Sequence, residues 1–281
     1  MNVLCIVLRL HKIGRMIFYF SGTGNTRWAA ESLAKATHEQ AIFIPDALMG
    51  DCHYMLNADE RIGFCFPVHG WRPPSIVHKF VERLTLSMHN AHDAISNHYC
   101  YVLITAGDTI GKTAEIFENH LNERGISASA VCTLIMPESY VGLPTMDVDT
   151  PEKETQKKET ARFQLEDFIE AVKGRHNGYS HLVRGPIPAF FSGAIGGFFL
   201  RHIVSDKPFR VESTRCVKCG ICADVCPVHN IKGGLGYEPQ WLHNGSCLSC
   251  FACYHHCPHH AIEYGRRTKH KGQYFFGRKK R

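Results

Sequence analysis

Two matching cysteine runs near the C-terminus constrain this 281-residue chain more than any other feature. Each run has the spacing C-x2-C-x2-C-x3-C-P. The first contains Cys216, Cys219, Cys222 and Cys226, and the second contains Cys247, Cys250, Cys253 and Cys257. Three thiols at steps of three can surround one centre from a single tight loop, whereas the fourth thiol of the run lies too far around the loop to reach the same centre. The proline after each run lacks an N–H and fixes φ, so the chain turns away there.

The doubled run resembles bacterial two-cluster ferredoxins, which hold cubane [4Fe-4S] clusters. In that family the fourth cysteine of each run ligates the cluster of the other run. The resemblance therefore implies two sets of ligands, one made of Cys216, Cys219, Cys222 and Cys257, the other of Cys226, Cys247, Cys250 and Cys253. It also implies a small α+β ferredoxin domain over residues 207–268.

A zinc site and a disulfide framework are the other uses of closely spaced cysteines. Zinc ribbons use two C-x2-C pairs with a spacer, but here a third cysteine follows each pair at the same step. Disulfides need an oxidising compartment. Residues 1–15 carry their charges after the apolar run, the reverse of a secretory signal, and Met16 is a candidate start. We therefore predict two [4Fe-4S] clusters, no structural zinc, a short N-terminal extension over residues 1–15 and a cytoplasmic location.

Charge is distributed unevenly along the chain. The net charge is +6, with +9 in residues 207–281 and −3 in residues 1–206. A basic half is typical of proteins that bind nucleic acid or anionic lipid. However, two oxidised clusters with their thiolates would lower +9 to about +5. We expect redox partner proteins, including acidic ones, and no nucleic acid. No uncharged apolar run reaches the roughly 18 residues that a membrane span needs.

Residues 16–36 predict an anion-binding turn. Met16–Phe20 is a short apolar run suited to a central parallel strand, and residues 27–36 suit a helix. Between them stand six residues, Ser21, Gly22, Thr23, Gly24, Asn25 and Thr26. Backbone N–H groups at a helix N-terminus attract phosphate. The glycines allow a close approach, and the polar side chains add donors.

The sequence FYFSGTGNT resembles the phosphate loop of flavodoxins, whose pattern T/S-x-T-G-x-T is met at Ser21, Thr23, Gly24 and Thr26. Flavodoxins bind the FMN phosphate with this loop, whereas a dinucleotide site would need G-x-G-x-x-G. The resemblance implies a doubly wound, five-stranded parallel sheet in the order 2-1-3-4-5 over residues 16–174. The later strands are expected at residues 41–48, 61–66, 98–105 and 127–136, with helices at 75–84 and 151–174.

In flavodoxins the loops after the third and fourth strands border the flavin ring. The first of these loops contains Pro67, Val68, His69 and Trp71, and the second begins with Ala106 and Gly107. Trp71 matches the aromatic residue that stacks on the isoalloxazine in that family. The second loop lacks the usual aromatic residue, so we expect stacking on one side only. Tyr140, after the fifth strand, is a weaker candidate for a flavin contact.

The second loop also approximates a nucleotide-binding P-loop. Residues 106–113 follow G-x4-G-K-[ST], with Ala106 in place of the first glycine. Lys112 and Thr113 would then bind phosphate and magnesium. No apolar strand ending in Asp completes a magnesium site, so this non-redox function is the weakest alternative.

The remaining segments are predicted from composition. Residues 175–206 form a linker with a hydrophobic strap, which carries Phe190, Phe191, Phe198 and Phe199. We expect the strap to bury one domain against the other, with a membrane-surface contact as the alternative. Four histidines flank Cys257 and are predicted to form a surface cluster, namely His255, His256, His259 and His260. Residues 269–281 are a basic tail, expected to meet an acidic partner or to fold back over the first domain.

The two domains together resemble the flavodoxin–ferredoxin fusion proteins of anaerobic bacteria and archaea. FMN exchanges one or two electrons and a cubane cluster exchanges one. We therefore predict an oxidoreductase-type electron carrier that links one-electron and two-electron reactions. The alternative is a reductase in which the flavin, fed by the clusters, reduces a small organic substrate.

Overall fold

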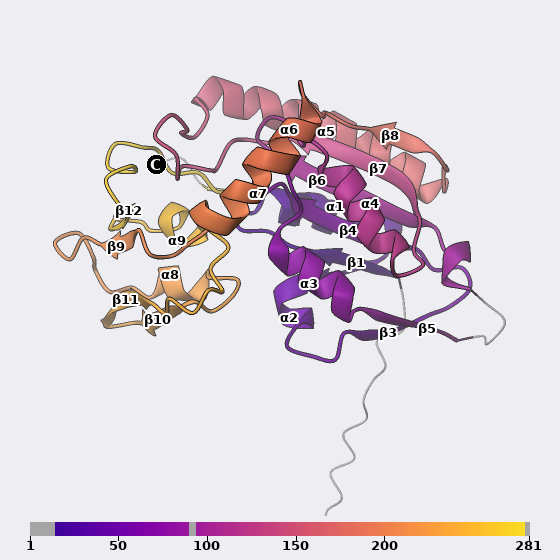
Figure 1. The fold of residues 1–281 in the computed structure, drawn as a ribbon, viewed down its shortest axis with the longest axis horizontal. Coiled ribbons are helices and arrows are strands. Elements are labelled where there is room, and N and C mark those ends of the chain that lie inside the picture. Colours follow the sequence, from indigo (N-terminus) through magenta and orange to yellow (C-terminus); the bar gives the residue numbers. More distant parts are fainter. Residues whose placement is uncertain (1–14, 90–93, 279–281) are drawn as a thin grey trace, which may run out of the picture.

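The computed structural model describes residues 15–89 and 94–278. It consists of a large α/β domain and a small domain beside it (Figure 1). Apart from Arg15, the predicted N-terminal extension lies outside the described residues. No helix in the described part of the chain is long and apolar enough to cross a membrane.

A six-stranded parallel sheet in the order β2-β1-β4-β6-β7-β8 forms the centre of the large domain. Its strands are β1 (Met16–Tyr19), β2 (Gln40–Phe43), β4 (Ile62–Pro67), β6 (Cys100–Ala106), β7 (Ala128–Ile135) and β8 (Tyr179–His181). Numbered by their place in the chain, the first five strands of this sheet follow the flavodoxin-like order 2-1-3-4-5, as predicted. The register pairs Phe18 with Phe64 and Cys65 with Leu103, so neighbouring strands end at one edge of the sheet.

Three parts of the large domain differ from the sequence-based expectation. The sixth strand, β8, lies inside the segment predicted as a linker and pairs with β7 at the sheet edge. The predicted strand over residues 41–48 is wrong in its second half, which is the helix α2 (Ile44–Ala47). Pro45 occupies the first turn of that helix, where its missing N–H costs no hydrogen bond. A separate parallel pair, β3 (His53–Leu56) and β5 (Thr85–Met88), was also unforeseen.

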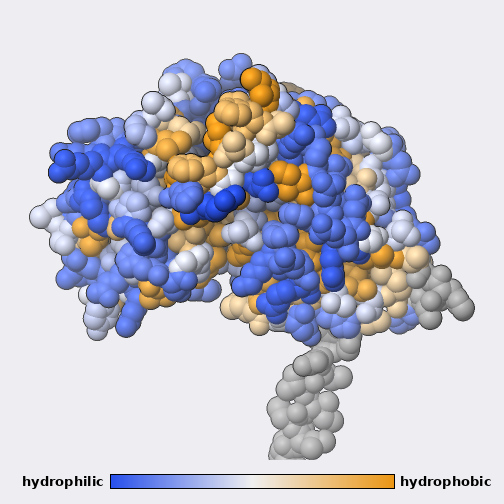
Figure 2. Space-filling model, in the orientation of Figure 1, coloured by the Kyte–Doolittle hydropathy of each residue, from blue (hydrophilic) through white to orange (hydrophobic). Residues whose placement is uncertain are grey.

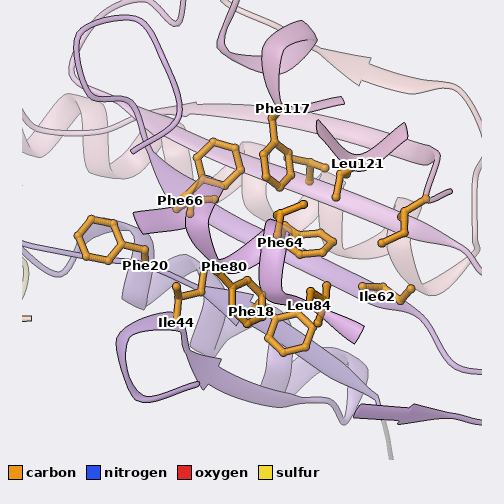
Figure 3. Packing of buried hydrophobic residues seen from close by; sticks show 14 of the residues in the cluster. Phe18, Phe20, Ile44, Ile62, Phe64, Phe66, Phe80, Leu84, Phe117 and Leu121 are labelled. Carbon is orange, nitrogen blue, oxygen red and sulfur yellow. The ribbon is translucent and has the colours of Figure 1, made fainter. Parts of the chain in front are cut away.

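Helices cover both faces of the sheet. They are α1 (Asn25–Thr37), α3 (Ser75–Arg83), α4 (Thr113–Asn122) and α5 (Pro151–Lys173), and a short turn η1 (Ile95–Asn97) precedes β6. Alternate residues of a strand point to opposite faces. Phe18 therefore packs with Phe80 of α3 in one apolar cluster, whereas Ile17 belongs to a second cluster with Phe168 of α5. Figure 3 shows the first cluster, in which aromatic rings from β1, β4, α3 and α4 interleave.

The strap is helical over residues 188–203. It runs through α6 (Pro188–Phe190), η2 (Phe191–Ile195), α7 (Gly196–Phe198) and η3 (Phe199–Ile203). Ser192 fixes it to the large domain, because its Oγ donates to the carbonyl of Trp71 at 2.8 Å and accepts the N–H of Lys112 at 2.7 Å. Hydrophobic residues lie along its outer side as well, and Phe190 and Phe198 are exposed (Figure 2).

The small domain is α+β, as predicted. Two antiparallel pairs form it, β9 (Phe209–Val211) with β12 (Ile262–Tyr264) and β10 (Ile231–Gly234) with β11 (Tyr237–Trp241). Two short helices, α8 (Ile221–Asp224) and α9 (Ala252–His255), complete it. Its compact core is aromatic, with Phe209 stacked on Trp241 at 5.4 Å between ring centroids.

Candidate functional site

The turn between β1 and α1 has the geometry that the sequence predicts. Gly24 caps α1 with φ of +92°, a conformation that glycine adopts without steric cost. Its N–H donates to Ser21 Oγ at 3.1 Å, and its carbonyl accepts the N–H of Trp28 at 2.9 Å. The N-terminus of a 13-residue helix therefore opens at this turn, with the partial positive charge that favours an anion.

The polar side chains of the turn bond to other protein groups. Thr23 Oγ1 donates to Ser139 Oγ at 3.2 Å, and Asn25 Nδ2 donates to the carbonyl of Pro137 at 3.1 Å. Thr26 Oγ1 lies 2.7 Å from Thr105 Oγ1. These bonds tie the turn to the end of β6 and to the loop that follows β7. The sequence predicts these side chains as phosphate donors, and that role stays a prediction.

A cleft of about 320 Å³ opens beside this turn. Eleven of the twelve residues predicted to hold a flavin line it, namely Ser21, Gly22, Thr23, Asn25, Thr26, Pro67, Val68, His69, Trp71, Ala106 and Gly107. Gly24 instead lines a second opening on the α1 side of the turn. The strap contributes Ile195, Phe198 and Phe199 to the cleft wall. The volume is that of a site for a small molecule or cofactor.

Trp71 stands in a strained turn at the mouth of the cleft. His69 and Arg72 exchange backbone hydrogen bonds, and both Gly70 and Trp71 have φ of +57°. Positive φ at both central residues defines a type I′ turn, which a bulky residue adopts at a cost. The Trp71 ring is held by Phe191 of the strap, at 4.8 Å between centroids, and its Nε1 donates to Thr109 Oγ1 at 3.2 Å. Strain of this kind often marks a functional site.

Two residues that follow β7 also line the cleft: Glu138, which the sequence analysis did not single out, and Tyr140, which it gave as a weaker candidate for a flavin contact. Burial raises the pKa of the Glu138 carboxyl. The carboxylate accepts the N–H groups of Ser139 and Tyr140 at 2.8 and 2.7 Å, and these bonds and the charge of Lys157 offset part of the rise in pKa. The hydroxyl of Tyr140 is buried without a hydrogen-bond partner among the described residues. The sequence signal was their place just after β7, at the carboxyl edge where α/β sheets bind ligands.

The eight cysteines of the doubled run surround two separate cavities. Cys216, Cys219, Cys222 and Cys257 line the first, and Cys226, Cys247, Cys250 and Cys253 line the second. These are the sets that the ferredoxin resemblance implies. Within the described residues, no three His, Cys, Asp or Glu side chains are grouped closely enough for a single metal ion. Burial raises the pKa of Cys222 and Cys247 to about 11, so binding of a cluster must release their protons.

The second cavity adjoins the cleft. Cys250 lines both, and Leu248 and Ser249 also reach the cleft wall. Gly22 of the turn packs so closely on Cys250 that a Cβ added at residue 22 would stand 2.8 Å from the Cys250 Cβ. Glycine is therefore required here by close approach. The cysteines of the first cavity do not line the cleft.

Comparisons with known proteins identify the small domain. Residues 209–258 match the 4Fe-4S dicluster domain family. A flavodoxin-like sheet joined to this dicluster domain supports an iron–sulfur flavoprotein in electron transfer. Among curated proteins, none matches the chain significantly.

Several solved structures resemble the large domain. They include flavodoxins from Streptococcus pneumonia TIGR4 and Megasphaera elsdenii, each 15% identical, and an FMN-dependent NADH-azoreductase from Bacillus anthracis, 8% identical. The TM-scores are 0.29, 0.30 and 0.34, and the matches cover 56%, 55% and 57% of this chain and 99%, 98% and 100% of those chains. At these scores the assignment of the fold rests on the strand order.

The histidines near Cys257 and the basic tail join the dicluster domain to the flavodoxin-like domain. The predicted surface cluster is wrong for His255, which is buried, with its Nε2 2.7 Å from the carbonyl of Ser139. The described part of the tail, residues 269–278, folds back over the first domain, one of its two expected positions. The N–H of Phe276 donates to the carbonyl of Thr23 at 2.8 Å, and the Tyr274 hydroxyl donates to Asn25 Oδ1 at 2.6 Å.

The loop that approximates a P-loop is closed by protein groups. The N–H groups of Ile110 and Gly111 donate to the carbonyls of Val183 and Arg184, at 2.9 and 3.1 Å. The Thr113 hydroxyl is fully buried and donates to the carbonyl of Ile110. Hydrogen-bond donors that a nucleotide phosphate would need are thus occupied by protein groups. This argues against nucleotide binding at residues 106–113.

Proposed function

We propose that this chain is a cytoplasmic electron carrier that passes electrons between two [4Fe-4S] clusters and FMN. The observation that carries the proposal is the shared wall formed by Gly22 and Cys250. Gly22 belongs to the phosphate turn and Cys250 to one set of cluster ligands, and their backbones approach closely. Electron transfer falls steeply with distance, so contact between two cofactor sites favours transfer within one chain.

The cleft fits FMN in two respects. The α1 N-terminus suits a phosphate, and the volume suits a ring system. The flavin would supply a centre that exchanges one or two electrons. Gly22 and Gly24 would let the backbone approach the phosphate, and Trp71 would face the ring. Phe199 packs against Gly70 and excludes water from that side.

Each cavity would hold one cluster. The set containing Cys250 would be the one nearer the flavin, and the set containing Cys216 would be farther away. Electrons would then pass along the chain through two one-electron centres before they reach the two-electron centre.

Cofactor content tests the proposal first. Anaerobic reconstitution should yield about eight irons and eight sulfides for each chain, with one FMN. Metal and sulfide analysis and the optical spectrum measure this. A colourless protein with one zinc for each four cysteines would exclude the clusters.

The rate of internal transfer tests the coupling. After rapid one-electron reduction of the clusters, the flavin should be reduced at a rate that does not depend on protein concentration. Changing both Phe198 and Phe199 to Ser should slow this step, because the strap forms part of the cleft wall. Flavin and iron contents of the variant are measured with the rate, so that slower transfer is distinguished from loss of a cofactor. A rate proportional to protein concentration would mean transfer between chains.

The second candidate function, a flavin-dependent reductase of a small organic substrate, is favoured by Glu138. A carboxyl whose pKa is raised by burial is suited to donate a proton. Turnover of a quinone without any protein partner would support this function. Glu138→Gln should then lower turnover and remove its pH dependence while flavin content stays the same. Without such turnover, the carrier function stands alone.

A further inference from the structure

The outer side of the helical strap is an exposed apolar face. Phe190, Ala194 and Phe198 follow one another at steps of four residues, which places them on one side of a helix. Phe190 is 53% exposed and Phe198 58%, and Ile187, just before the helix, is 67% exposed. Figure 2 shows hydrophobic residues along the strap. These four residues are called the outer face below.

The inner side of the strap is apolar too, and it already contacts the large domain. Phe191 packs on the ring of Trp71, and Phe199 packs on Gly70 and on the ring of Tyr140. A surface helix normally has one apolar and one polar side, whereas a helix that is apolar all round is normally buried. Contacts within the described chain account for the inner side alone, so the outer face fits a helix that is covered by another partner.

The outer face has almost no side chains that form hydrogen bonds. Between residues 186 and 200 the only polar side chain is that of Ser192. It is buried and bonded to backbone groups of Trp71 and Lys112. A protein interface typically contains about one hydrogen bond for every 100–200 Å², whereas the acyl boundary of a lipid surface requires none from the side chains that enter it. The face therefore suits lipid better than a protein partner.

Cations gather at the C-terminal end of the strap. Residues 184–207 contain three Lys or Arg (184, 201 and 207) and one acid (206), which gives +2. Arg201 and Lys207 are exposed and form no ion pair among the described residues. Asp206 is buried and bonded to His243 and Asn230. This end of the strap is therefore positively charged.

The other acids near the strap lie away from that end. Glu115 of α4 is 2.6 Å from Arg184, so it neutralises the cation at the N-terminal end. Glu118 lies one turn farther along α4, and Asp108 lines the cleft. An apolar helix face with unpaired cations at one end is the pattern of helices that lie on anionic membranes.

We propose that the outer face of the strap binds an anionic phospholipid surface, with the helix lying in the plane of the headgroups. Phe190 and Phe198 would enter the acyl boundary, and Arg201 and Lys207 would meet the phosphates. Phe198 also lines the cleft, so the mouth of the cleft would lie at the lipid surface. The inference goes beyond the proposed function and does not depend on it.

Vesicle flotation tests this proposal. The probes are vesicles made of equal parts of phosphatidylcholine and phosphatidylglycerol, and vesicles of phosphatidylcholine alone, mixed anaerobically with the protein that carries all its cofactors. The protein should float with the anionic vesicles, and added salt should weaken the binding. Arg201→Glu should weaken binding to the anionic vesicles and reduce its salt dependence.

Gly193 offers a matched pair of variants on the outer side of the strap. It is exposed, and an added Cβ would meet no atom within 4 Å, so a larger side chain fits there. Gly193→Leu should tighten binding about tenfold, because it adds apolar area to the face. Gly193→Glu should weaken binding by a similar factor. Phe163→Ser removes an exposed ring from α5, outside the strap, and should leave binding unchanged.

Three results would overturn the proposal. One is that the original protein floats with neither kind of vesicle, and another is that the two Gly193 variants bind equally. The third is a dimer that sedimentation velocity detects without vesicles and that Gly193→Glu dissociates, because a second copy of the chain would then cover the face. Circular dichroism and the iron and flavin contents of each variant show whether it is folded like the original protein.

Discussion

In the flavodoxin-like domain, helices cover both faces of one sheet, and Phe18 and Phe64 are wholly buried among aromatic rings. In the dicluster domain, the strands form two separate pairs, and eight cysteines face two cavities at its centre. A small domain buries a smaller share of its surface, and a metal centre often supplies the missing stabilisation. The comparison suggests that apolar burial stabilises the first domain and cofactor binding the second.

Removal of the clusters should give the largest difference between the domains. Chelation of iron under oxidising conditions should unfold residues 209–264, because their core is small and the buried cysteines lose the clusters that hold them together. The flavodoxin-like domain should keep its sheet. Limited proteolysis with mass spectrometry would locate the cuts. Cuts spread equally over both domains would contradict the comparison.

A substitution that leaves a cavity in the core of the sheet should destabilise the flavodoxin-like domain and leave the dicluster domain unaffected. Phe64→Ala removes a ring that contacts Phe18 and Phe117, and it should lower the free energy of unfolding by about 3–5 kcal/mol. Iron content should not change. Denaturant unfolding followed by circular dichroism measures the loss. Phe163→Ala, at an exposed site, should change it by less than about 0.5 kcal/mol.

The contact between domains should give an intermediate effect. His255→Ala leaves the carbonyl of Ser139 and the N–H of Tyr274 without their partner. Such a loss costs about 1–3 kcal/mol. Hydrogen exchange in residues 271–278 should become faster, and exchange in β4 and β6 should stay slow. Unchanged exchange in the tail would mean that the two domains are joined by other contacts.

The smallest effect is expected at the phosphate turn. Thr23→Ala removes the hydrogen bond to Ser139, worth about 0.5–1.5 kcal/mol. Flavin should bind about two- to tenfold more weakly, since the turn is less firmly held. Titration of the apoprotein with FMN measures the affinity. The iron content of this variant serves as the control and should equal that of the original protein.

Short sequence patterns were sufficient to predict the elements whose formation depends on residues close together in the chain. Met16–Tyr19 is uniformly apolar and became a central strand, and Pro151 is the start predicted for α5. The resemblance of the cysteine runs to two-cluster ferredoxins predicted the two groups that line the cavities. The failures have physical causes. β8 is a three-residue edge strand, too short to show a period of two, and it exists because β7 offers an unpaired edge.

The sequence by itself indicated which residues gather at the carboxyl edge of the sheet, because the strand–turn–helix pattern over residues 16–36 is local and its resemblance to flavodoxins implies the strand order. Only the tertiary structure decided that Cys250 stands against Gly22, and that His255 and Tyr274 bond to the flavodoxin-like domain. These pairs join residues 116 to 249 positions apart. No periodicity connects such distant positions. Their contacts arise because side chains of the two domains complement one another in shape and hydrogen bonding when they pack together.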